Sequence, residues 1–597
     1  MFWNWRTSMK KRILAAALAC LLLAGCGVRR TEPLAAEEPA AVGTEIAYVP
    51  LDDRPDNVER VEYLADSLGY QLVMPEEVLY RTALDCQPKN FDSLQRGEPW
   101  SLLTWVLEQE AAGCDRYILS LDQMHSGGLV SSRSMTGDEV PLPGGGTASS
   151  SELMDSLLSA LAQDENNVVW LLDSVMRLAP TVGYEGGTTE EYNALRAYGA
   201  EPRLGLDGSS LTIENIETDY RRDGGGAPLD PAAFGLTEAR VDEYLAARSR
   251  KLRLSDRMLE TVRGDGYENF RVLIGIDDSS AEECIQKNEI AYLRGCLREG
   301  DALLSGVDDL AFKAVVKLYL EEIGWTGADV AVRYYGGTED QPACIYDFQP
   351  LTSIVAEHLD FFGLAETADA DLQMLVLTRP ADEAKKADYY NALIRDLNDC
   401  RKQNRPVILM DAGNNRYGTA FHDALTEKAE LGWLLSYAGF LDMAIVTGTA
   451  LSHGVARYAF LQNGERTDAT ERAFARTLAD SIIKDFCYRN VVREDVAACI
   501  RDELGGNANN FWQPEIDIQR VTDLLTRRMD EEAADEVRNL ERSNFISSLK
   551  PYAERGWGGI ELEDYRFPWD RAFEIGMDIR LGEFTEPHEK VLNWYVK

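Results

Sequence analysis

Short apolar runs rich in β-branched residues alternate with helical patterns along most of this chain. Typical runs are VVWLL (168–172) and RVLIGI (271–276), and a helical pattern such as the one at 351–362 follows most of them. Strands that alternate with helices of this length indicate a mainly parallel sheet with helical crossovers. The continuous apolar character of the runs is typical of strands buried on both faces. The sequence therefore predicts an α/β core, either doubly wound or closed as a (β/α)-barrel-like structure.

The predicted strands and the first helix follow from apolar periodicity. After the first run, apolar residues from Val58 to Leu68 have the spacing of an amphipathic helix, and Asp56 with Glu59 predicts a capping box at its start. The predicted strands lie at residues 46–51, 116–121, 168–172, 271–276, 302–307, 330–334, 372–377, 407–410 and 443–446.

The pattern changes towards the C-terminus and predicts a division of the chain. The α/β core is expected at 44–455, with a helical region at 456–550 that includes long helices at 468–503 and 515–549. A small β appendage is expected at 551–597, because apolar and polar residues alternate from Ile575 to Leu581. The glycine-containing stretch 181–232 is expected to be a long surface loop.

The N-terminus has the pattern of a lipoprotein signal peptide. Four basic residues between Arg6 and Arg12 precede an apolar stretch at 13–24, and small residues lead into Cys26. This stretch is too short to cross a bilayer as a stable helix, which needs about 20 residues, and its flanks are typical of a cleaved export signal. We therefore expect a signal peptide at 1–26, lipidation of Cys26, a flexible tether at 27–43, and an extracytoplasmic protein anchored to the membrane by lipid.

Net charge limits the range of partners. The chain has 61 Lys and Arg against 101 Asp and Glu, and its formal net charge is -40. Phosphate backbones are bound through clustered cations, so we expect no nucleic-acid partner.

Acidic residues follow many of the predicted strands. Asp52 and Asp53 come directly after the first run in YVPLDDRP. The other acids at or near strand ends are Asp122, Asp173, Asp277, Asp278, Asp308, Asp309 and Asp411. Parallel strands all end on the same edge of a sheet, where the loops form the crevice that binds ligands. We therefore expect these carboxylates to meet around one opening.

Clustered carboxylates can do three different things. Their pKa values can split, which suits the acid/base pairs of glycoside hydrolysis. They can hold Ca²⁺ or Mg²⁺, or each can cap a helix or pair with an arginine. Arg54, Arg133 and Arg177 lie on the same loops and could neutralise the acids or clamp a ligand. His125, close to Asp122, is the one histidine on the proposed edge and a candidate general acid/base.

Several enzyme classes lack their signatures in this sequence. There is no HExxH or other histidine metal motif, no GxSxG elbow, no P-loop and no GxGxxG. The sequence thus gives no support to a zincin, a serine hydrolase of the elbow type, an NTPase or a dinucleotide-binding enzyme, and it assigns no cofactor.

Several segments along the mature chain are similar to those of one bacterial family. The matching pieces are YVPLDDRP, LSLDQMHSGGLVSSR, DSVMR, YLAARSR, IGIDDS, DFCYRNVVR and FPWDRAFEI. On these segments the chain resembles the domain of unknown function 4127 family, and the resemblance implies no assigned reaction. This chain departs from the family pattern at Ser126, where Tyr is usual, and at Phe440, Leu441, Asp442 and Ile445, where Trp, Asn and Thr and a further Asn are usual. These departures imply a changed specificity or a loss of activity.

The preferred hypothesis is a membrane-tethered hydrolase of glycosidic bonds that acts on a carbohydrate or a cell-wall-derived ligand. IGIDDS is similar to the adjacent Asp-Asp at a strand end in some barrel glycosidases, so Asp277 and Asp278 are the predicted catalytic residues. The predicted substrate-binding residues are Asp52, Asp53, Arg54, Asp122, His125, Arg133, Asp173, Arg177 and Asp411. Two alternatives stay open: a non-catalytic lipoprotein that binds a glycan or peptide, and a metal-dependent ester or amide hydrolase that uses Ca²⁺ or Mg²⁺.

Overall fold

A computed structural model describes most of the chain. The described residues are 43–81, 97–182, 188–413, 419–439, 443–509, 511, 516–543, 556–557, 559–569, 571–582 and 584–585. All of them belong to one compact unit, Glu38–Lys597. The predicted signal peptide with Cys26, and the predicted tether apart from Gly43, lie outside the described residues.

The first sheet has six parallel strands in the order β2-β1-β3-β6-β7-β8. Its strands are β1 (Thr44–Val49), β2 (Tyr70–Val73), β3 (Arg116–Ser120), β6 (Val168–Val175), β7 (Phe270–Ile276) and β8 (Ala302–Ser305). The chain starts in the middle of this sheet and winds outwards in both directions, which is a doubly wound arrangement.

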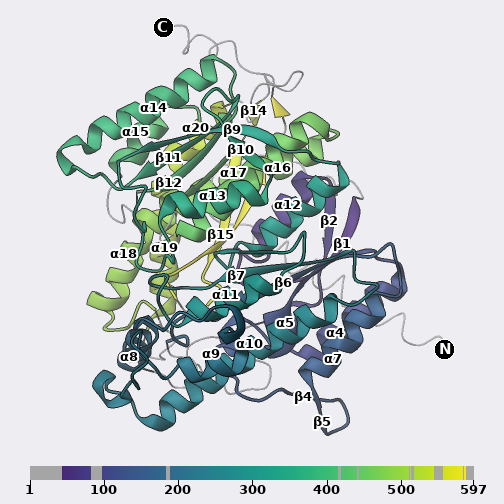
Figure 1. Cartoon of the computed structure of the whole chain (residues 1–597). Helices are drawn as coiled ribbons and strands as arrows, with labels where there is room; N and C mark the ends of the chain where they lie inside the picture. The colour runs from purple at the N-terminus through teal and green to yellow at the C-terminus, as the bar shows by residue number, and fades with distance from the viewer. Residues whose placement is uncertain are drawn as a thin grey trace, which may run out of the picture. The chain divides into compact units, whose positions relative to one another are not determined.

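The second sheet has five parallel strands in the order β10-β9-β11-β12-β13. Its strands are β9 (Ala328–Tyr335), β10 (Leu364–Glu366), β11 (Leu372–Thr378), β12 (Val407–Ala412) and β13 (Ser436–Gly439). Both sheets can be followed in Figure 1, and each opens with the same order, its second strand beside its first and its third on the other side. The predicted α/β fold is confirmed. Within the described residues both sheets are open, so the doubly wound alternative holds and the barrel does not.

Successive residues of the central strands pack into different cores. In β1, Ile46 and Tyr48 belong to a core that also contains residues of the second sheet, whereas Ala47 and Val49 belong to a core on the other face. The first core is completed by α2 (Glu59–Ser67), α12 (Leu310–Glu322), α13 (Leu351–Phe361) and α16 (Met443–Asn463). Burial on both faces explains the unbroken apolar runs of the sequence.

Helices cover the outer face of each sheet. Those on the first sheet's side include α4 (Pro99–Ala112), α7 (Ser150–Leu161), α10 (Glu238–Val262) and α11 (Gln286–Cys296). Those on the second sheet's side include α14 (Lys386–Lys402), α15 (Ala420–Lys428), α17 (Asp468–Ile482) and α19 (Ile518–Glu532). Shorter elements are α3 (Glu77–Tyr80), α5 (Leu121–Ser126), α6 (Leu129–Ser132), β4 (Glu139–Pro141) and β5 (Thr147–Ser149).

The C-terminal part is helical and then forms small antiparallel pairs, as predicted. The helical stretch of α17 continues through a π-helical segment (Ile483–Val492), α18 (Arg493–Ala498) and a second π-helical segment (Cys499–Glu503). After α20 (Ala534–Arg542), β15 (Ile560–Arg566) pairs with β16 (Gly576–Leu581), and β14 (Gly556–Trp557) pairs with β17 (Phe584–Thr585). No helix among the described residues is long and apolar enough to cross a membrane.

Three local predictions are wrong. The strand predicted at 443–446 is the start of α16, and the last strand of the second sheet is instead β13; a short buried apolar run does not reveal its own period. The loop predicted at 181–232 contains α8 (Thr189–Ala200) and α9 (Ile213–Asp219). Asp56 does not cap α2, because its carboxylate instead binds Arg60, at 3.1 Å, and Arg489.

Candidate functional site

The carboxyl edge of the first sheet gathers most of the predicted site residues. Asp52, Asp53 and Arg54 follow β1, and Asp277 and Asp278 follow β7. Asp122 lies in the first turn of α5 after β3, Asp308 follows β8, and Asp173 lies inside β6, two residues before its end. Asp411 is different, because β12 belongs to the second sheet.

A cleft of about 370 Å³ opens at this edge. The loops of the first sheet contribute Arg54, Arg133, Arg177, Asp277, Asp278 and Asp308 to its wall. Residues from much later in the chain complete the wall, namely Ile445, Arg493, Asn509, Trp569, Arg571 and Phe573. The volume is within the range of small-molecule binding sites.

Three arginine–aspartate pairs organise the wall of the cleft. The shortest distance between guanidinium nitrogen and carboxylate oxygen is 2.5 Å for Arg54–Asp308, 2.6 Å for Arg133–Asp277 and 2.5 Å for Arg177–Asp278. Arg54 also binds Asp52, at 2.9 Å. Each lining carboxylate therefore has a guanidinium next to it, so the wall combines acids with cations.

Asp277 holds Arg133 in place. The Nε and Nη2 atoms of Arg133 donate to Oδ2 of Asp277 at 3.0 and 2.6 Å, and the backbone N–H of Asp278 donates to Oδ1 at 2.8 Å. Burial lowers the pKa of Arg133, against the attraction of Asp277. The side chain of Asp277 is only 4% exposed, whereas those of Asp278 and Asp308 are 20% and 18% exposed. All three carboxylates line the cleft, and Asp278 and Asp308 are the more exposed ones.

Aromatic rings lie beside these charges. The indole N–H of Trp569 donates to Oδ1 of Asp53 at 3.1 Å, and the guanidinium of Arg54 lies 4.9 Å from the centre of the Trp569 ring. On another side, the guanidinium of Arg177 lies 5.6 Å from the ring of Tyr192. Phe573, which is 38% exposed, also lines the cleft. Stacking of cations on these rings fixes their orientation and leaves apolar surface for a ligand.

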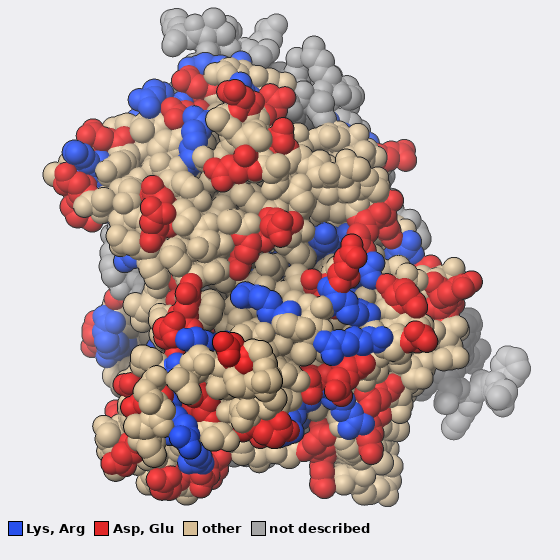
Figure 2. All heavy atoms as spheres, in the orientation of Figure 1, with Lys and Arg blue, Asp and Glu red and all other residues tan. Residues whose placement is uncertain are grey.

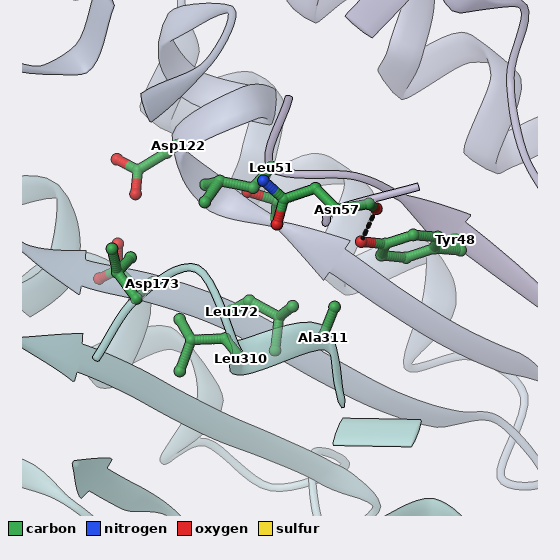
Figure 3. A pocket seen from close by; sticks show the side chains of 10 residues that line it. Tyr48, Leu51, Asn57, Asp122, Leu172, Asp173, Leu310 and Ala311 are labelled. Atoms are coloured by element: carbon green, nitrogen blue, oxygen red, sulfur yellow. Dashed lines mark hydrogen bonds between the residues drawn. The ribbon is translucent and has the colours of Figure 1, made fainter. Parts of the chain in front are cut away.

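A second, much smaller cavity lies deeper, between β1 and β3. It has a volume of about 10 Å³ and is lined by Tyr48, Asn57, Ser120, Asp122 and Asp173, together with apolar side chains (Figure 3). This place is the switch point of the sheet, where ligands of doubly wound proteins usually bind. Here the space is enough for about one water molecule. The space large enough for a ligand at this edge is the cleft of about 370 Å³.

Lys251 of α10 neutralises the two acids beside the small cavity. Its Nζ lies 2.6 Å from Oδ1 of Asp122 and also donates to Oδ1 of Asp173. Ser174 donates to the other oxygen of Asp122 at 2.6 Å. Burial lowers the pKa of Lys251, but the attraction of the two carboxylates outweighs burial and raises the pKa above its ordinary value. This buried triad fixes α10 to the strand ends.

His125 and Asp411 do not line the cleft. The Nδ1 of His125 lies 3.2 Å from the Ser150 hydroxyl, and burial, with the nearby charges of Lys251 and Arg250, lowers the pKa of His125 to about 3. Asp411 lies 3.0 Å from Nε2 of His422 and accepts a hydrogen bond from the backbone N–H of Gly413 at 2.9 Å. Both residues have local partners, and the geometry gives neither a place on the wall.

Sequence reasoning gave no role to several residues that the fold brings to this edge. Lys251 is one, and Arg493, Arg571 and Glu574 are the others. Glu574 accepts a hydrogen bond from the backbone N–H of Asp56 at 2.9 Å, and burial, with the nearby charge of Asp56, raises the pKa of Glu574 to about 8. Three of these residues lie inside the segments DFCYRNVVR and FPWDRAFEI, so the family-like segments contained the missing signal.

Among the described residues, no three His, Cys, Asp or Glu side chains come together in a way that could hold a metal ion. This finding agrees with the alternation of acids and cations on the wall, because each lining acid has an arginine as its neighbour.

Comparisons with known proteins place the whole core in one family. The sequence pattern of the family described as "Protein of unknown function (DUF4127)" matches residues 46–578. No curated protein and no solved structure matches the chain. The match covers both sheets apart from the first two residues of β1, the helical region and β15, together with the first half of β16. This chain is therefore a member of the DUF4127 family of proteins of unknown function.

Proposed function

We propose that the protein binds a carbohydrate or a cell-wall-derived glycan in the cleft at the carboxyl edge of the first sheet. The observation that supports this most is the composition of the wall, where Trp569, Tyr192, Tyr346 and Phe573 lie among ion-paired polar groups. Sugar rings present apolar faces and hydroxyl edges, so a site for them needs aromatic surface and fixed hydrogen-bonding groups together.

The fixed polar groups are held by contacts that do not depend on a ligand. Arg133 donates to Asp277 and, through Nη1, to the Thr181 hydroxyl at 2.8 Å. Arg54 is bound by Asp52 and Asp308. A wall that is rigid before binding loses little conformational entropy on binding, which favours affinity.

Hydrolysis of a glycosidic bond is the second candidate function. It is favoured by the exposure of two carboxylates, Asp278 and Asp308, on the wall of one cleft. Glycosidases act through two such groups on either side of the bond. In this candidate Asp277 positions Arg133 and the polypeptide around Asp278, and does not itself meet the substrate.

A paired measurement separates binding from hydrolysis. We expect Asp278→Asn/Asp308→Asn to abolish turnover of a panel of aryl glycosides if the cleft is catalytic, with binding of the same sugars retained by calorimetry. Binding without turnover by the wild type would support the binder, and absence of both would overturn the proposal. Glu561→Gln/Glu563→Gln is a matched control, because it removes two acids from the exposed face of β15.

We also propose that the chain is an extracytoplasmic lipoprotein, from the pattern that ends at Cys26. In a bacterial host, Cys26→Ala is expected to prevent incorporation of radiolabelled palmitate and to move the protein out of the detergent-soluble membrane fraction. A Cys26→Ala protein that keeps both properties would contradict this proposal.

A further inference from the structure

The cleft is cationic although the chain is acidic. Among the described residues, five arginines and three aspartates line it, which gives this part of the wall a formal charge of 5 - 3 = +2, whereas the whole chain has a net charge of -40. Figure 2 shows many acidic side chains on one face of the molecule, with Lys and Arg side chains among them. A cationic wall on such a protein is a local exception, and a cleft concentrates the field of its lining charges.

The five arginines have different tasks. Arg54 forms ion pairs with two carboxylates. Arg133 donates hydrogen bonds to Asp277 through Nε and Nη2 and to Thr181 through Nη1. These two form the frame of the wall. The remaining three, Arg177, Arg493 and Arg571, come from the loop after β6, from α18 and from the loop before β16.

Arg177 keeps donors for a ligand. Both of its polar contacts within the described residues use Nη2, which lies 2.9 Å from the Tyr192 hydroxyl and 2.5 Å from Oδ2 of Asp278. Its Nε is buried and has no hydrogen-bond partner there, while the side chain as a whole stays 15% exposed. Five N–H donors in a fixed fork match the oxygens of a carboxylate, phosphate or sulfate group.

Arg571 connects a second part of the cleft wall, the loop before β16, to the loop that carries Arg177. Its Nη2 donates to the backbone carbonyl of Val182 at 2.8 Å. Val182 follows Thr181, which binds Arg133, and both residues line the cleft. The loop before β16 is thereby fixed to the loop after β6, the loop that also carries Arg177.

We infer that the ligand of this cleft is an acidic saccharide, whose carboxylate, phosphate or sulfate group binds to Arg177, Arg493 and Arg571. This inference rests on the proposed binding of carbohydrate and adds the charge of the ligand. Trp569 and Phe573 supply the apolar surface for the ring. The three arginines supply charge-assisted hydrogen bonds, which are stronger than those between neutral groups.

Titration calorimetry with three sugars of the same ring tests the inference. Glucose is the neutral probe, glucuronate carries a carboxylate and glucose 6-phosphate carries a phosphate ester, so the two acidic arms also identify the anion. We expect at least one acidic sugar to bind about tenfold or more tightly than glucose at low salt. We also expect this preference to shrink when the ionic strength is raised.

Two double variants test whether the preference for acidic sugars over glucose depends on the cleft. Arg493→Gln/Arg571→Gln is expected to reduce the ratio of acidic-sugar affinity to glucose affinity to about threefold or less. Arg501→Gln/Arg520→Gln removes the same charge from exposed positions outside the cleft and is expected to change little. Circular dichroism of both variants checks that they are folded.

The outcomes distinguish the inference from the proposed function. If glucose binds as tightly as both acidic sugars, or if the preference survives in Arg493→Gln/Arg571→Gln, the inference is wrong and carbohydrate binding stands. If inorganic sulfate binds to the wild type and not to this variant, while no sugar binds, the anion site stands and the carbohydrate proposal is wrong. If neither sugars nor sulfate bind, both are wrong.

Discussion

The two sheets begin with the same strand order, yet their carboxyl edges are built differently. At the first edge, three arginine–aspartate pairs stand on the wall of a cleft of about 370 Å³. At the second edge, Asp411 and His422 are buried together, and the ring of His422 stacks on Phe486 with 3.4 Å between centroids. The topology places polar side chains at both edges, but it does not decide whether an edge stays open.

The segments that cover each edge make the difference. The π-helical segment brings Phe486 onto the second edge, and Asp485 in the same segment accepts a hydrogen bond from the backbone N–H of Gly439, at the end of β13. The first edge is met by the loop that contains Trp569 and Phe573, which lines the cleft and leaves it open. This contrast between the described parts of the two edges supports the proposal that the first edge binds the ligand.

The largest predicted effect comes from the buried triad beneath the first edge. Lys251→Met leaves Asp122 and Asp173 buried without their cation, so we expect the free energy of unfolding to fall by about 3 to 5 kcal/mol. Urea denaturation measures it. Lys287→Met is the control, because Lys287 pairs with Glu283 in a partly exposed position on α11, and a change of less than about 1 kcal/mol is expected. Equal losses in the two variants would contradict the role given to the triad.

A second comparison sets Asp277 against Asp411. Asp277→Asn leaves Arg133 buried without an acid, and we expect it to cost about 3 kcal/mol of unfolding free energy and to weaken sugar binding. Asp411→Asn weakens the contact with His422, and we expect a cost of about 1 kcal/mol and unchanged binding. Denaturation and calorimetry on both variants give the answer. Loss of binding in Asp411→Asn alone would reverse the assignment of the two edges.

Glu574 makes the first edge sensitive to pH. Burial, with the nearby Asp56, raises its pKa from 4.5 to about 8, although Arg54, Arg489 and Lys484 act in the opposite direction. Between these two pH values the folded protein holds the proton and the unfolded chain does not, so this group makes stability fall as pH rises through the window and level off above it.

The variant Glu574→Gln removes this titration. We expect its free energy of unfolding to increase relative to wild type as pH rises from 4.5 to about 8, because only the wild type must then ionise a buried group. Denaturant curves at several pH values test this, with the exposed Glu561→Gln as control. Parallel pH profiles for wild type and Glu574→Gln would show that Glu574 titrates normally.

The smallest predicted effect concerns the aromatic wall. Trp569→Leu keeps apolar volume but removes the flat ring beside Arg54, so we expect sugar affinity to fall about fivefold, with stability changed by less than about 1 kcal/mol. Calorimetry with glucuronate measures this change. Trp100→Leu, on α4 outside the cleft lining, is expected to leave affinity unchanged.

The strands could be predicted because burial on both faces leaves a strong local signal. Runs such as 271–276 are almost wholly apolar, and β7 occupies Phe270–Ile276. The pattern of apolar residues does not separate a buried strand from a buried helix that directly follows it. At 436–463 the chain passes from β13 to α16 through residues that are mostly apolar or small, and no change of period shows where the strand ends.

The candidate site could be predicted in part, in its strand-end acids and in Arg54, Arg133 and Arg177 on the same loops. A carboxylate at a strand end can be recognised in the sequence, because the apolar run of the strand shows where the strand ends. The partner of that carboxylate is not visible: Arg133 and Asp277 are 144 residues apart, and Trp569 and Asp53 are 516 apart. Pairing of this kind depends on tertiary structure, so the sequence left open whether the acids share a site or pair with arginines, and it did not show which arginine pairs with which acid. The predicted site residues therefore fall into three groups: residues that line the cleft, buried residues that support its wall, and Asp411 at the carboxyl edge of the second sheet.

The most direct test of the account is a crystal structure of the protein soaked with glucuronate and, separately, with glucose 6-phosphate. The account predicts a sugar in the cleft at the carboxyl edge of the first sheet, with its ring against Trp569 and its anionic group bound to Arg177. A sugar bound instead beside Asp411 and His422, with the cleft empty, would contradict the central claim that the first edge is the functional one.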